Sequence, residues 1–297
     1  DISQYDNSVS SNEDIFYDVD GNDDLTACSA SGSTGCTLSV LSGNTYRPDS
    51  GSSGNITAAN LSNAGTLSAD GNTIYVSGSL TSSGTFNANT STVNFNGTGA
   101  QTIPAFDYNN LTSSSTGART LASSGTIGIA SIFTPGSNSY TVTGSTMNFN
   151  GSSAQTVNAD FTYNNLQVQP SANSVTTNFA AGTVTVNGDL TIGNGTNTSV
   201  VVNANNASTT LSVAGSVSIS GNTTFQANAS NTFTIGDDFT NNGTFTHNNG
   251  TVVFNDNSKT SSLNYSADTT FYNLSITTAG KAMQFDEAQK TTVTHTL

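Results

Sequence analysis

The sequence has little charge, and almost none of it is positive. Charged residues make up 8% of the 297 residues, with five Lys plus Arg against nineteen Asp plus Glu, and the formal net charge is −14. A protein that neutralises phosphate groups needs clustered Lys and Arg, so we expect no nucleic-acid partner. The same shortage of cations argues against binding to an anionic membrane surface. No apolar run approaches the roughly 18 residues of a spanning helix, so we expect no membrane insertion.

The sequence also lacks the groups that most hydrolases use. It has two histidines, His247 and His295, and neither has an acidic neighbour in the sequence. It contains no GxSxG, HExxH or Gly-rich phosphate loop. Asp237 and Asp238 are the acidic pair that a polysaccharide-cleaving enzyme would need, but adjacent residues of a strand point to opposite faces. We therefore expect a protein that is not an enzyme.

Cysteine is nearly absent, since Cys28 and Cys36 are the two cysteines of the chain. They are separated only by SASGSTG. Two cysteines this close in a chain of secreted character are expected to form a disulfide. Closing so short a loop stabilises a fold by roughly 2–3 kcal/mol in the chain-entropy model. Two thiols without a nearby histidine do not make a zinc site.

An acidic motif near the N-terminus suggests one cofactor, Ca²⁺. Asp18, Asp20, Asn22 and Asp24 alternate in the segment DVDGNDD, and their oxygens could converge on a hard cation if the loop curls. The glycine is at the fourth position rather than the sixth, and no Glu follows at the twelfth, so this is not an EF-hand loop. The alternative interpretation is a solvated acidic turn.

What the sequence has in abundance is an internal repeat. The stretch Thr92–Leu111 returns as Thr146–Leu166, and more loosely as Thr251–Leu274. Phe95 and Phe149 occupy the same place in successive copies and mark the register. A fixed internal period is the signature of repeat architectures, so it constrains the fold before any single residue does.

A shorter period divides each repeat. Leu61–Leu67 matches Leu80–Phe86 at a shift of 19, so a unit of about 54 residues is predicted to contain three coils of about 18 to 19. The coils carry short alternating runs such as Thr-Ile-Tyr-Val and Thr-Val-Asn-Phe, which indicate strands. One coil cannot bury its own apolar face, whereas stacked coils can. We therefore predict an all-β fold, a parallel β-helix or β-solenoid, whose thin core suits the hydrophobic fraction of 33%.

The alternative architecture is a string of β-sandwich domains, which frequent turn signals would also suit. The Asn-Gly steps at 96–97 and 150–151 are of this kind, because Asn-Gly also forms hairpin turns. Antiparallel excursions from the solenoid therefore stay open at this point.

Residues 1–55 do not follow the period. Eight of the nineteen acidic residues lie in the first 24, and both cysteines follow soon after. A solenoid end exposes strand edges and core, so it needs an atypical terminal element. We predict an acidic, cysteine-containing N-terminal cap or contact segment at residues 1–55, and a solenoid domain at residues 56–297 that ends mid-repeat. The expected partner is another copy of the chain, bound head to tail, or further repeats of a longer chain.

The repeat is similar to one found in a class of surface proteins. Its pattern is carried by Gly188–Thr191, Asn242–Phe245, Gly250–Phe254, Ala154–Val157 and Phe271–Ile276. It resembles the Ser/Thr/Asn/Gly-rich β-solenoid repeats of large secreted bacterial and archaeal surface proteins of the adhesin, surface-layer or extracellular-fibre type. The resemblance covers most of residues 56–297, and it implies a structural or adhesive role outside the cell.

Composition and resemblance together predict a non-catalytic structural protein of an extracellular assembly, either a filament or a surface layer. The alternative is a cell-surface adhesin that binds glycans or neighbouring cells, and the least favoured hypothesis is a polysaccharide-degrading β-helix enzyme. Exposed aromatic side chains would mark a glycan site. The tyrosines of the repeats are the candidates: Tyr75, Tyr108, Tyr140, Tyr163 and Tyr272.

Overall fold

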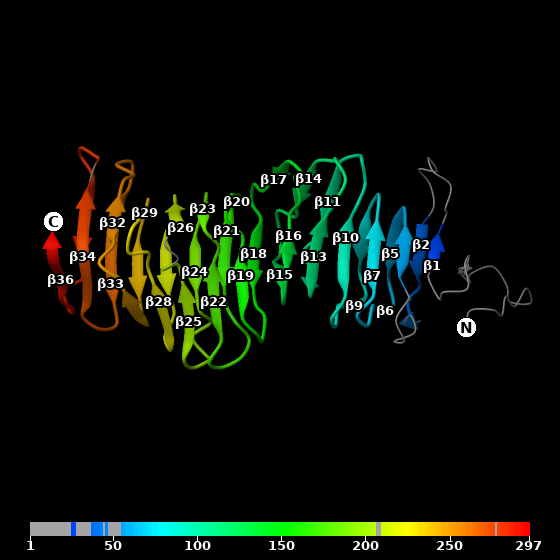
Figure 1. Cartoon of the computed structure of the whole chain (residues 1–297), viewed down its shortest axis with the longest axis horizontal. Helices are drawn as coiled ribbons and strands as arrows, with labels where there is room; N and C mark the ends of the chain where they lie inside the picture. The colour runs from blue at the N-terminus through cyan, green and yellow to red at the C-terminus, as the bar shows by residue number, and fades with distance from the viewer. Residues whose placement is uncertain (1–24, 28–36, 44, 47–54, 206–208, 277) are drawn as a thin grey trace, which may run out of the picture. The chain divides into compact units, whose positions relative to one another are not determined.

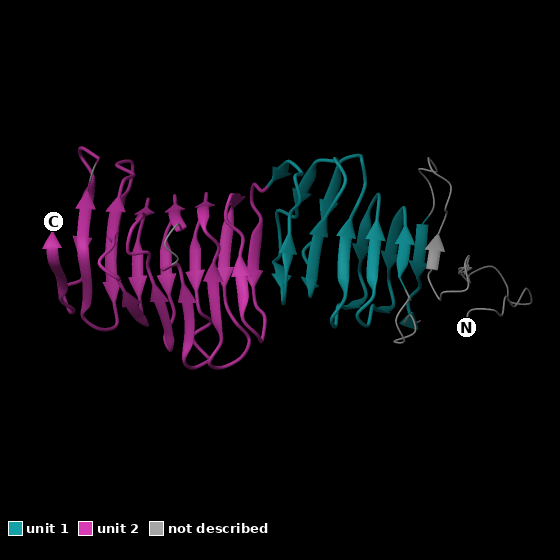
Figure 2. Ribbon diagram, in the orientation of Figure 1, with its two compact units in different colours: residues 1–141 teal, residues 142–297 magenta. Residues whose placement is uncertain are grey.

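The chain folds into parallel β-coils. The structure is a computed structural model that describes residues 25–27, 37–43, 45–46, 55–205, 209–276 and 278–297. These residues form strands β1 to β36 and no helix, in about 11 turns (Figure 1). The chain divides into unit 1, residues 1–141, and unit 2, residues 142–297 (Figure 2). The predicted parallel β-solenoid is confirmed.

In unit 1 each full coil contributes one strand to each of three faces. The strands of the β1 sheet are followed along the chain by those of the β2 and β11 sheets, and then by the β3 sheet and the β12–β15 pair. In this order the strands are β1 (Leu25–Ala27), β4 (Ile56–Ala58), β7 (Thr73–Val76), β10 (Thr92–Phe95), β13 (Asn110–Ser113), β16 (Phe133–Thr134); β2 (Thr37–Val40), β5 (Asn60–Asn63), β8 (Leu80–Ser82), β11 (Gln101–Ile103), β14 (Arg119–Leu121), β17 (Tyr140–Thr141); β3 (Thr45–Tyr46), β6 (Thr66–Ser68), β9 (Thr85–Asn87), β12 (Asp107–Tyr108) and β15 (Ile127–Ile129).

Unit 2 has the same plan with three sheets, named here after their first strands in this unit: the β18 sheet, the β19 sheet and the β20 sheet. In this order the strands are β18 (Thr146–Phe149), β21 (Asn165–Val168), β24 (Leu190–Ile192), β27 (Val217–Ile219), β30 (Phe239–Asn241), β33 (Thr260–Tyr265), β35 (Ala282–Phe285); β19 (Gln155–Val157), β22 (Thr176–Phe179), β25 (Val200–Asn203), β28 (Thr223–Gln226), β31 (Thr244–Thr246); β20 (Phe161–Tyr163), β23 (Gly182–Val186), β26 (Thr209–Val213), β29 (Thr232–Ile235), β32 (Thr251–Phe254), β34 (Thr269–Ile276) and β36 (Thr291–Thr296).

Alternation along each strand builds the core. In β10 the apolar Val93 and Phe95 are buried, and the polar Thr92 and Asn94 between them face outward. The pairing register then stacks like on like, because Val93 pairs with Ile74 in the coil before it. Each coil thus adds a few buried side chains to a narrow column, and coil-to-coil contact is what removes them from water.

Coil length differs between the two units. In unit 1 Ile56 pairs with Ile74, so this coil has the length that the sequence predicts. In unit 2 Leu190 pairs with Val217, which makes that coil clearly longer, and over the whole chain the spacing is about 22. Extra residues of this coil lie in corner loops such as residues 193–199. Loops accept insertions at small entropic cost, so the strand pattern survives while the period does not.

The sequence repeat is therefore not a whole number of coils in unit 2, where one repeat of the sequence spans fewer than three coils. Phe149 and Phe254 are equivalent in the repeat, and both are fully buried. Phe149 nevertheless lies in the β18 sheet and Phe254 in the β20 sheet. An inward-facing aromatic residue fits any face of the column, so the sequence motif can move from one face to another.

The β-sandwich alternative is wrong, because every strand pair within the described residues of either unit is parallel. The Asn-Gly steps are corners rather than hairpins. The N–H groups of Gly97 and Gly151 donate to the side-chain oxygens of Gln101 and Gln155, at 2.8 and 2.6 Å.

Part of the predicted cap joins the coils, since β1, β2 and β3 pair with β4, β5 and β6. The rest of residues 1–55 lies largely outside the described residues, and the cap stays a prediction.

Candidate functional site

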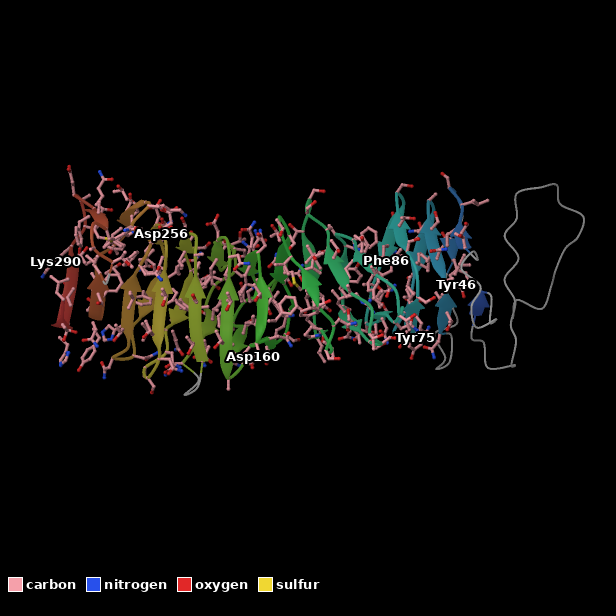
Figure 3. All side chains as sticks on the ribbon, turned by 90° about the horizontal axis from the view of Figure 1, so that it is seen from above. Tyr46, Tyr75, Phe86, Asp160, Asp256 and Lys290 are labelled. Carbon is pink, nitrogen blue, oxygen red and sulfur yellow. The ribbon has the colours of Figure 1, made fainter. Side chains whose placement is uncertain are left out.

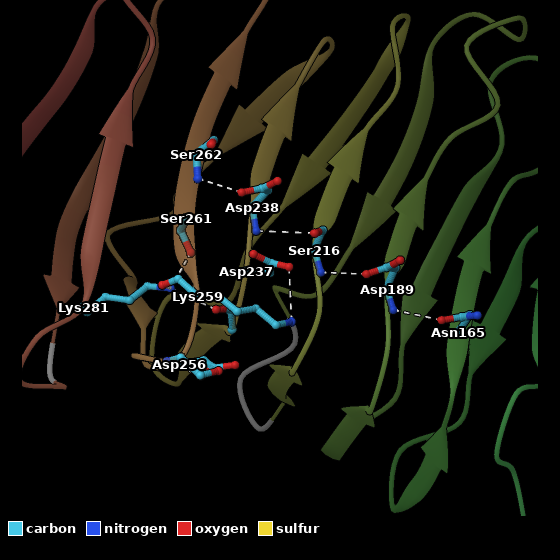
Figure 4. A network of polar contacts seen from close by, with 12 residues as sticks. Asn165, Asp189, Ser216, Asp237, Asp238, Asp256, Lys259, Ser261, Ser262 and Lys281 are labelled. Atoms are coloured by element: carbon cyan, nitrogen blue, oxygen red, sulfur yellow. Dashed lines mark hydrogen bonds and ion pairs between the residues drawn. The ribbon is translucent and has the colours of Figure 1, made fainter.

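Polar side chains form a ladder along one corner of unit 2, between the β20 sheet and the β18 sheet (Figure 4). Each member directly precedes a buried apolar residue of a strand of the β18 sheet. The pairing of Leu166 with Leu190, and of Leu190 with Val217, keeps successive members in line. We call this set the corner ladder, and its members are Asn165, Asp189, Ser216, Asp238 and Ser262.

Each side-chain oxygen of the corner ladder accepts a hydrogen bond from the backbone N–H of the next member. Asn165 Oδ1 accepts from Asp189 N at 3.1 Å, and Asp189 Oδ1 accepts from Ser216 N at 2.8 Å. Ser216 Oγ accepts from Asp238 N at 3.4 Å, and Asp238 Oδ1 accepts from Ser262 N at 2.7 Å. The side chains of the corner ladder therefore accept hydrogen bonds from backbone N–H groups at the corner that have no partner in the sheets.

A lysine cluster lies beside this ladder. Lys259 Nζ and Asp237 Oδ2 are 3.2 Å apart, in an ion pair whose side chains are 40% and 28% exposed. Lys281 Nζ donates to Lys259 O at 3.2 Å and, two coils back, to Gly236 O at 3.1 Å. It also donates to Ser261 Oγ at 2.5 Å. Burial lowers the pKa of Lys281, and the carboxylates of Asp256 and Asp237 act in the opposite direction.

This arrangement holds coils together and presents little to a substrate. Asp237 and Asp238 lie in the bend between β29 and β30, rather than on a strand. One is paired with Lys259 and the other accepts the N–H of Ser262. Ser261 has a lysine amine at its hydroxyl, as an activated nucleophile would, but its side chain is fully buried. The expectation of a non-enzyme is not tested by this geometry and stays a prediction.

In unit 1 one corner is held together differently, by the fully buried side chain of Arg119. Arg119 stands in register between Gln101 and Tyr140. Gln101 Nε2 donates to the carbonyl oxygens of Val76 and Gly78, both at 2.8 Å. The guanidinium extends this use of carbonyl groups: Nη2 donates to Phe95 O (2.8 Å), Gly97 O (3.1 Å) and Ser114 O (2.7 Å), and Nη1 to Gly99 O (3.4 Å) and Ala118 O (3.3 Å). Burial lowers the pKa of Arg119, and Tyr140 acts in the opposite direction.

The two histidines take part in an aromatic stack. His247 follows β31, and its Nδ1 accepts the N–H of Asn249 at 3.0 Å. Its ring stacks on Tyr272 with centroids 5.8 Å apart, and the ring of His295 stacks on the other side at 4.7 Å and 10°. A register shift between β34 and β36, next to Tyr272, accompanies this contact. Bulges re-aim side chains in this way.

The tyrosines that the sequence suggested as candidates for a glycan site differ in their burial. Tyr108 and Tyr163 are buried in the core, where burial raises their pKa well above the ordinary value. Tyr140 is half-buried and donates its hydroxyl to Ser113 Oγ at 2.7 Å. Tyr75, labelled in Figure 3, and Tyr272 lie at outward positions of their strands and are half-exposed.

Two predicted sites lie outside the described residues: the calcium loop at Asp18, Asp20, Asn22 and Asp24, and the disulfide between Cys28 and Cys36. Both stay predictions. In the part of the chain that the structure describes, no group of three or more His, Cys, Asp or Glu side chains could hold a metal ion. No helix among the described residues is long and apolar enough to cross a membrane.

Sequence reasoning missed both the corner ladder and the aromatic stack. The ladder had a local signal, a polar residue between glycine and an apolar residue, as in Gly188-Asp189-Leu190 and Gly215-Ser216-Val217. The stack had none, because His247 lies in a loop, and Tyr272 and His295 lie in two strands whose pairing shifts register at this point.

A scan against protein-family models finds none that matches the chain, and searches of the curated proteins and of the solved structures find no similar protein.

Proposed function

We propose that this chain is a non-catalytic structural module of an extracellular assembly, in which β-solenoid coils continue from one repeat to the next. The observation that carries this proposal is how unit 2 uses its polar groups. Asp189 and Asp238, which could otherwise bind or react, accept backbone N–H groups of the following coil. Lys281 bonds to groups in both preceding coils. These side chains connect successive coils of the stack.

Extension of the stack is supported by the outermost described coil. Within the described residues of unit 2, β35 and β36 each pair on one side only. The apolar side chains of Phe285 and Leu297 are 46% and 82% exposed there. Open edges of this kind recruit another strand. We propose that another copy of the chain, bound head to tail, covers them with a further coil.

The test places a charge in this open coil. Electron microscopy and light scattering of the wild-type chain should show filaments or a lattice, and Phe285→Asp should leave monomers. Ile132→Asp is the matched control, because Ile132 is 60% exposed and belongs to unit 1. A wild-type chain that stays monomeric at high concentration, or equal assembly of both variants, would overturn head-to-tail assembly. Deletion of residues 1–24 then asks whether that segment supplies the covering strand.

An extracellular location is supported by the lysine-poor, acidic, Ser/Thr/Asn-rich composition and by the resemblance of the repeats to those of secreted surface proteins. Localisation of the protein in fractionated source cells checks this part of the proposal independently of assembly. Recovery in the cytosolic fraction alone would contradict it.

The second candidate function, a glycan-binding adhesin, is favoured by the half-exposed stack of His247, Tyr272 and His295. The phenol of Tyr272 offers a hydrogen bond beside aromatic surface, a combination that suits ligands with apolar and polar edges. A glycan-array screen of the wild type and Tyr272→Ala tests it. Binding that Tyr272→Ala abolishes would support an adhesin, and no bound glycan would leave the structural role alone.

A further inference from the structure

One face of unit 2 carries ranks of hydroxyl groups. Along the β20 sheet side chains alternate, so the buried Val184, Leu211, Phe233 and Val252 orient their neighbours outward. Six of these eight neighbours are threonine, one is Ser212, and one, Val253, carries no hydroxyl group and ends the second rank. We call those with hydroxyl groups the threonine array, and its members are Thr183, Thr185, Thr210, Ser212, Thr232, Thr234 and Thr251.

The pairing register places the array in two straight ranks. Thr183 pairs with Thr210, and Thr232 pairs with Thr251. The second rank runs through Thr185, Ser212 and Thr234. Neighbouring strands of a sheet lie about 4.8 Å apart, and alternate residues of one strand about 6.7 Å apart. The array is therefore a rectangular grid with these two spacings.

The hydroxyl groups of the grid are left to solvent. Of the array members, which all lie among the described residues, only Thr251 has a hydrogen bond to its hydroxyl, from Asn273 Nδ2 at 3.1 Å. The β19 sheet differs, because there Asn203 Nδ2 donates to Asn178 Oδ1 of the neighbouring strand at 3.0 Å. The outward groups of the β20 sheet are thus free to match an external lattice.

The grid is also uncharged and stiff. None of the strands of the β20 sheet contains Asp, Glu, Lys or Arg, although the chain has a formal net charge of −14. Threonine is β-branched and has few rotamers, so its hydroxyl and methyl groups keep their positions. A preorganised surface loses little conformational entropy on binding.

We propose that the threonine array binds crystalline water, so that the β20 sheet of unit 2 is an ice-binding face. Ice offers flat planes of water oxygens with repeats close to both spacings of the grid. Hydroxyl groups at those spacings can replace lattice waters, while the methyl groups between them order the water in contact. A neutral polysaccharide crystal is the competing ligand, and the lack of aromatic rings within the array disfavours it. This activity goes beyond the structural role and does not require assembly.

The experiment measures incorporation of the full chain into a slowly growing ice hemisphere, together with the shape and growth of single ice crystals in its solution. The wild type should enter the ice and restrict crystal growth. Thr185→Lys and Thr234→Lys should lose both effects, because a long charged side chain in mid-grid lifts the face from the lattice. Thr191→Lys is the matched control, since Thr191 is an outward-facing threonine of the β18 sheet.

Circular dichroism checks that each variant is folded, and Thr210→Lys replaces any variant that is not. Exclusion of the wild type from ice overturns the proposal, and so does equal loss in the control. Retention on crystalline cellulose or chitin without an effect on ice overturns it as well, and assigns the face to polysaccharide. Filaments or monomers seen in the microscope bear only on the structural role, so the two proposals fail separately.

Discussion

Backbone groups at the coil corners need hydrogen-bond partners, and the two units supply them with opposite chemistry. In unit 1 Arg119 donates hydrogen bonds, and in unit 2 the corner ladder accepts them. Arg119 is fully buried and gathers carbonyl oxygens from several turns of backbone. Asp189 and Asp238 are surface carboxylates that each accept one backbone N–H. The direction of the spare backbone groups explains the difference. Carbonyl groups that face inward need a donor inside, and N–H groups that face outward need an acceptor at the surface.

The chemical type of a polar residue at a coil corner therefore indicates which backbone groups, N–H or C=O, lack a partner there. The two corners should also differ in how much each side chain contributes to the free energy of unfolding. A buried donor that is removed leaves its acceptors without water, whereas an exposed acceptor that is removed is replaced by solvent. Substitutions at the two corners should therefore differ in their cost to stability.

The largest effect is expected from Arg119→Met. Methionine fills part of the space but leaves the carbonyl groups of Gly97 and Ser114 without this donor, and leaves Phe95 O with the backbone N–H of Ser114 alone. Each buried acceptor left without a donor costs about 1–3 kcal/mol, and this substitution leaves two. Because coils interact mainly with their neighbours, we expect the loss to appear as faster hydrogen exchange in residues 95–121, read by mass spectrometry.

Arg119→Gln is the matched control, since glutamine stands at the equivalent position of the preceding coil and bonds two carbonyl groups there. Its exchange should lie between those of the wild type and Arg119→Met. Equal protection in all three proteins would show that the buried cation is not needed, and the comparison of corners would lose its basis.

Gly215→Ala should have the next largest effect, because the corner ladder needs close backbone approach. A Cβ at Gly215 would lie 2.5 Å from the carbonyl oxygen of Gly188 in the preceding coil. Overpacking of this kind costs about 1–3 kcal/mol, measured as a lower free energy of unfolding in urea. In Gly221→Ala the nearest atom is Asn242 O at 3.7 Å, so this variant should match the wild type. A destabilised Gly221→Ala would contradict this reading of the corner.

Asp238→Ala should cost less, about 0.5 to 1.5 kcal/mol, because water can reach the released Ser262 N–H. Asp238→Asn keeps an oxygen in place of the one that accepts this N–H at 2.7 Å, so it should restore most of the stability. Urea unfolding of the pair separates the hydrogen bond from the charge. If Asp238→Asn is as unstable as Asp238→Ala, the negative charge rather than the acceptor oxygen makes the stabilising contribution.

The sequence predicted the architecture because apolar residues alternate in runs such as Thr92–Phe95, and because threonine, valine and isoleucine suit a pleated surface. It did not predict coil length in unit 2, since loops such as residues 193–199 add residues to a coil outside its strands. It did not predict the role of Arg119 either. A lone arginine in an irregular stretch reads as a surface residue, and only the carbonyl groups brought together by the coils make its burial favourable.

Acid should separate the two corners without any substitution. Asp286 is a further carboxylate of unit 2 that accepts backbone N–H groups, from Tyr265 at 3.1 Å, Ala288 at 2.7 Å and Gln289 at 3.2 Å. These bonds hold its pKa below the ordinary value of 3.8. The folded state therefore binds the proton less readily than the unfolded state. The stabilisation is present above pH 3.8 and is lost as the pH falls through the lower pKa of the folded state.

Hydrogen exchange, corrected for its intrinsic pH dependence, should accordingly speed up at Tyr265 and at residues 286–289 as the pH falls below about 4. Residues 95–121 should not change over this range, because an arginine bonded only to carbonyl groups has nothing to titrate there. Asp286→Asn should remove the pH dependence of the unit 2 peptides, since an amide does not ionise. If the corner of unit 1 opens with acid before that of unit 2, the titrating group lies elsewhere and the contrast between a buried cation and surface carboxylates does not govern acid stability.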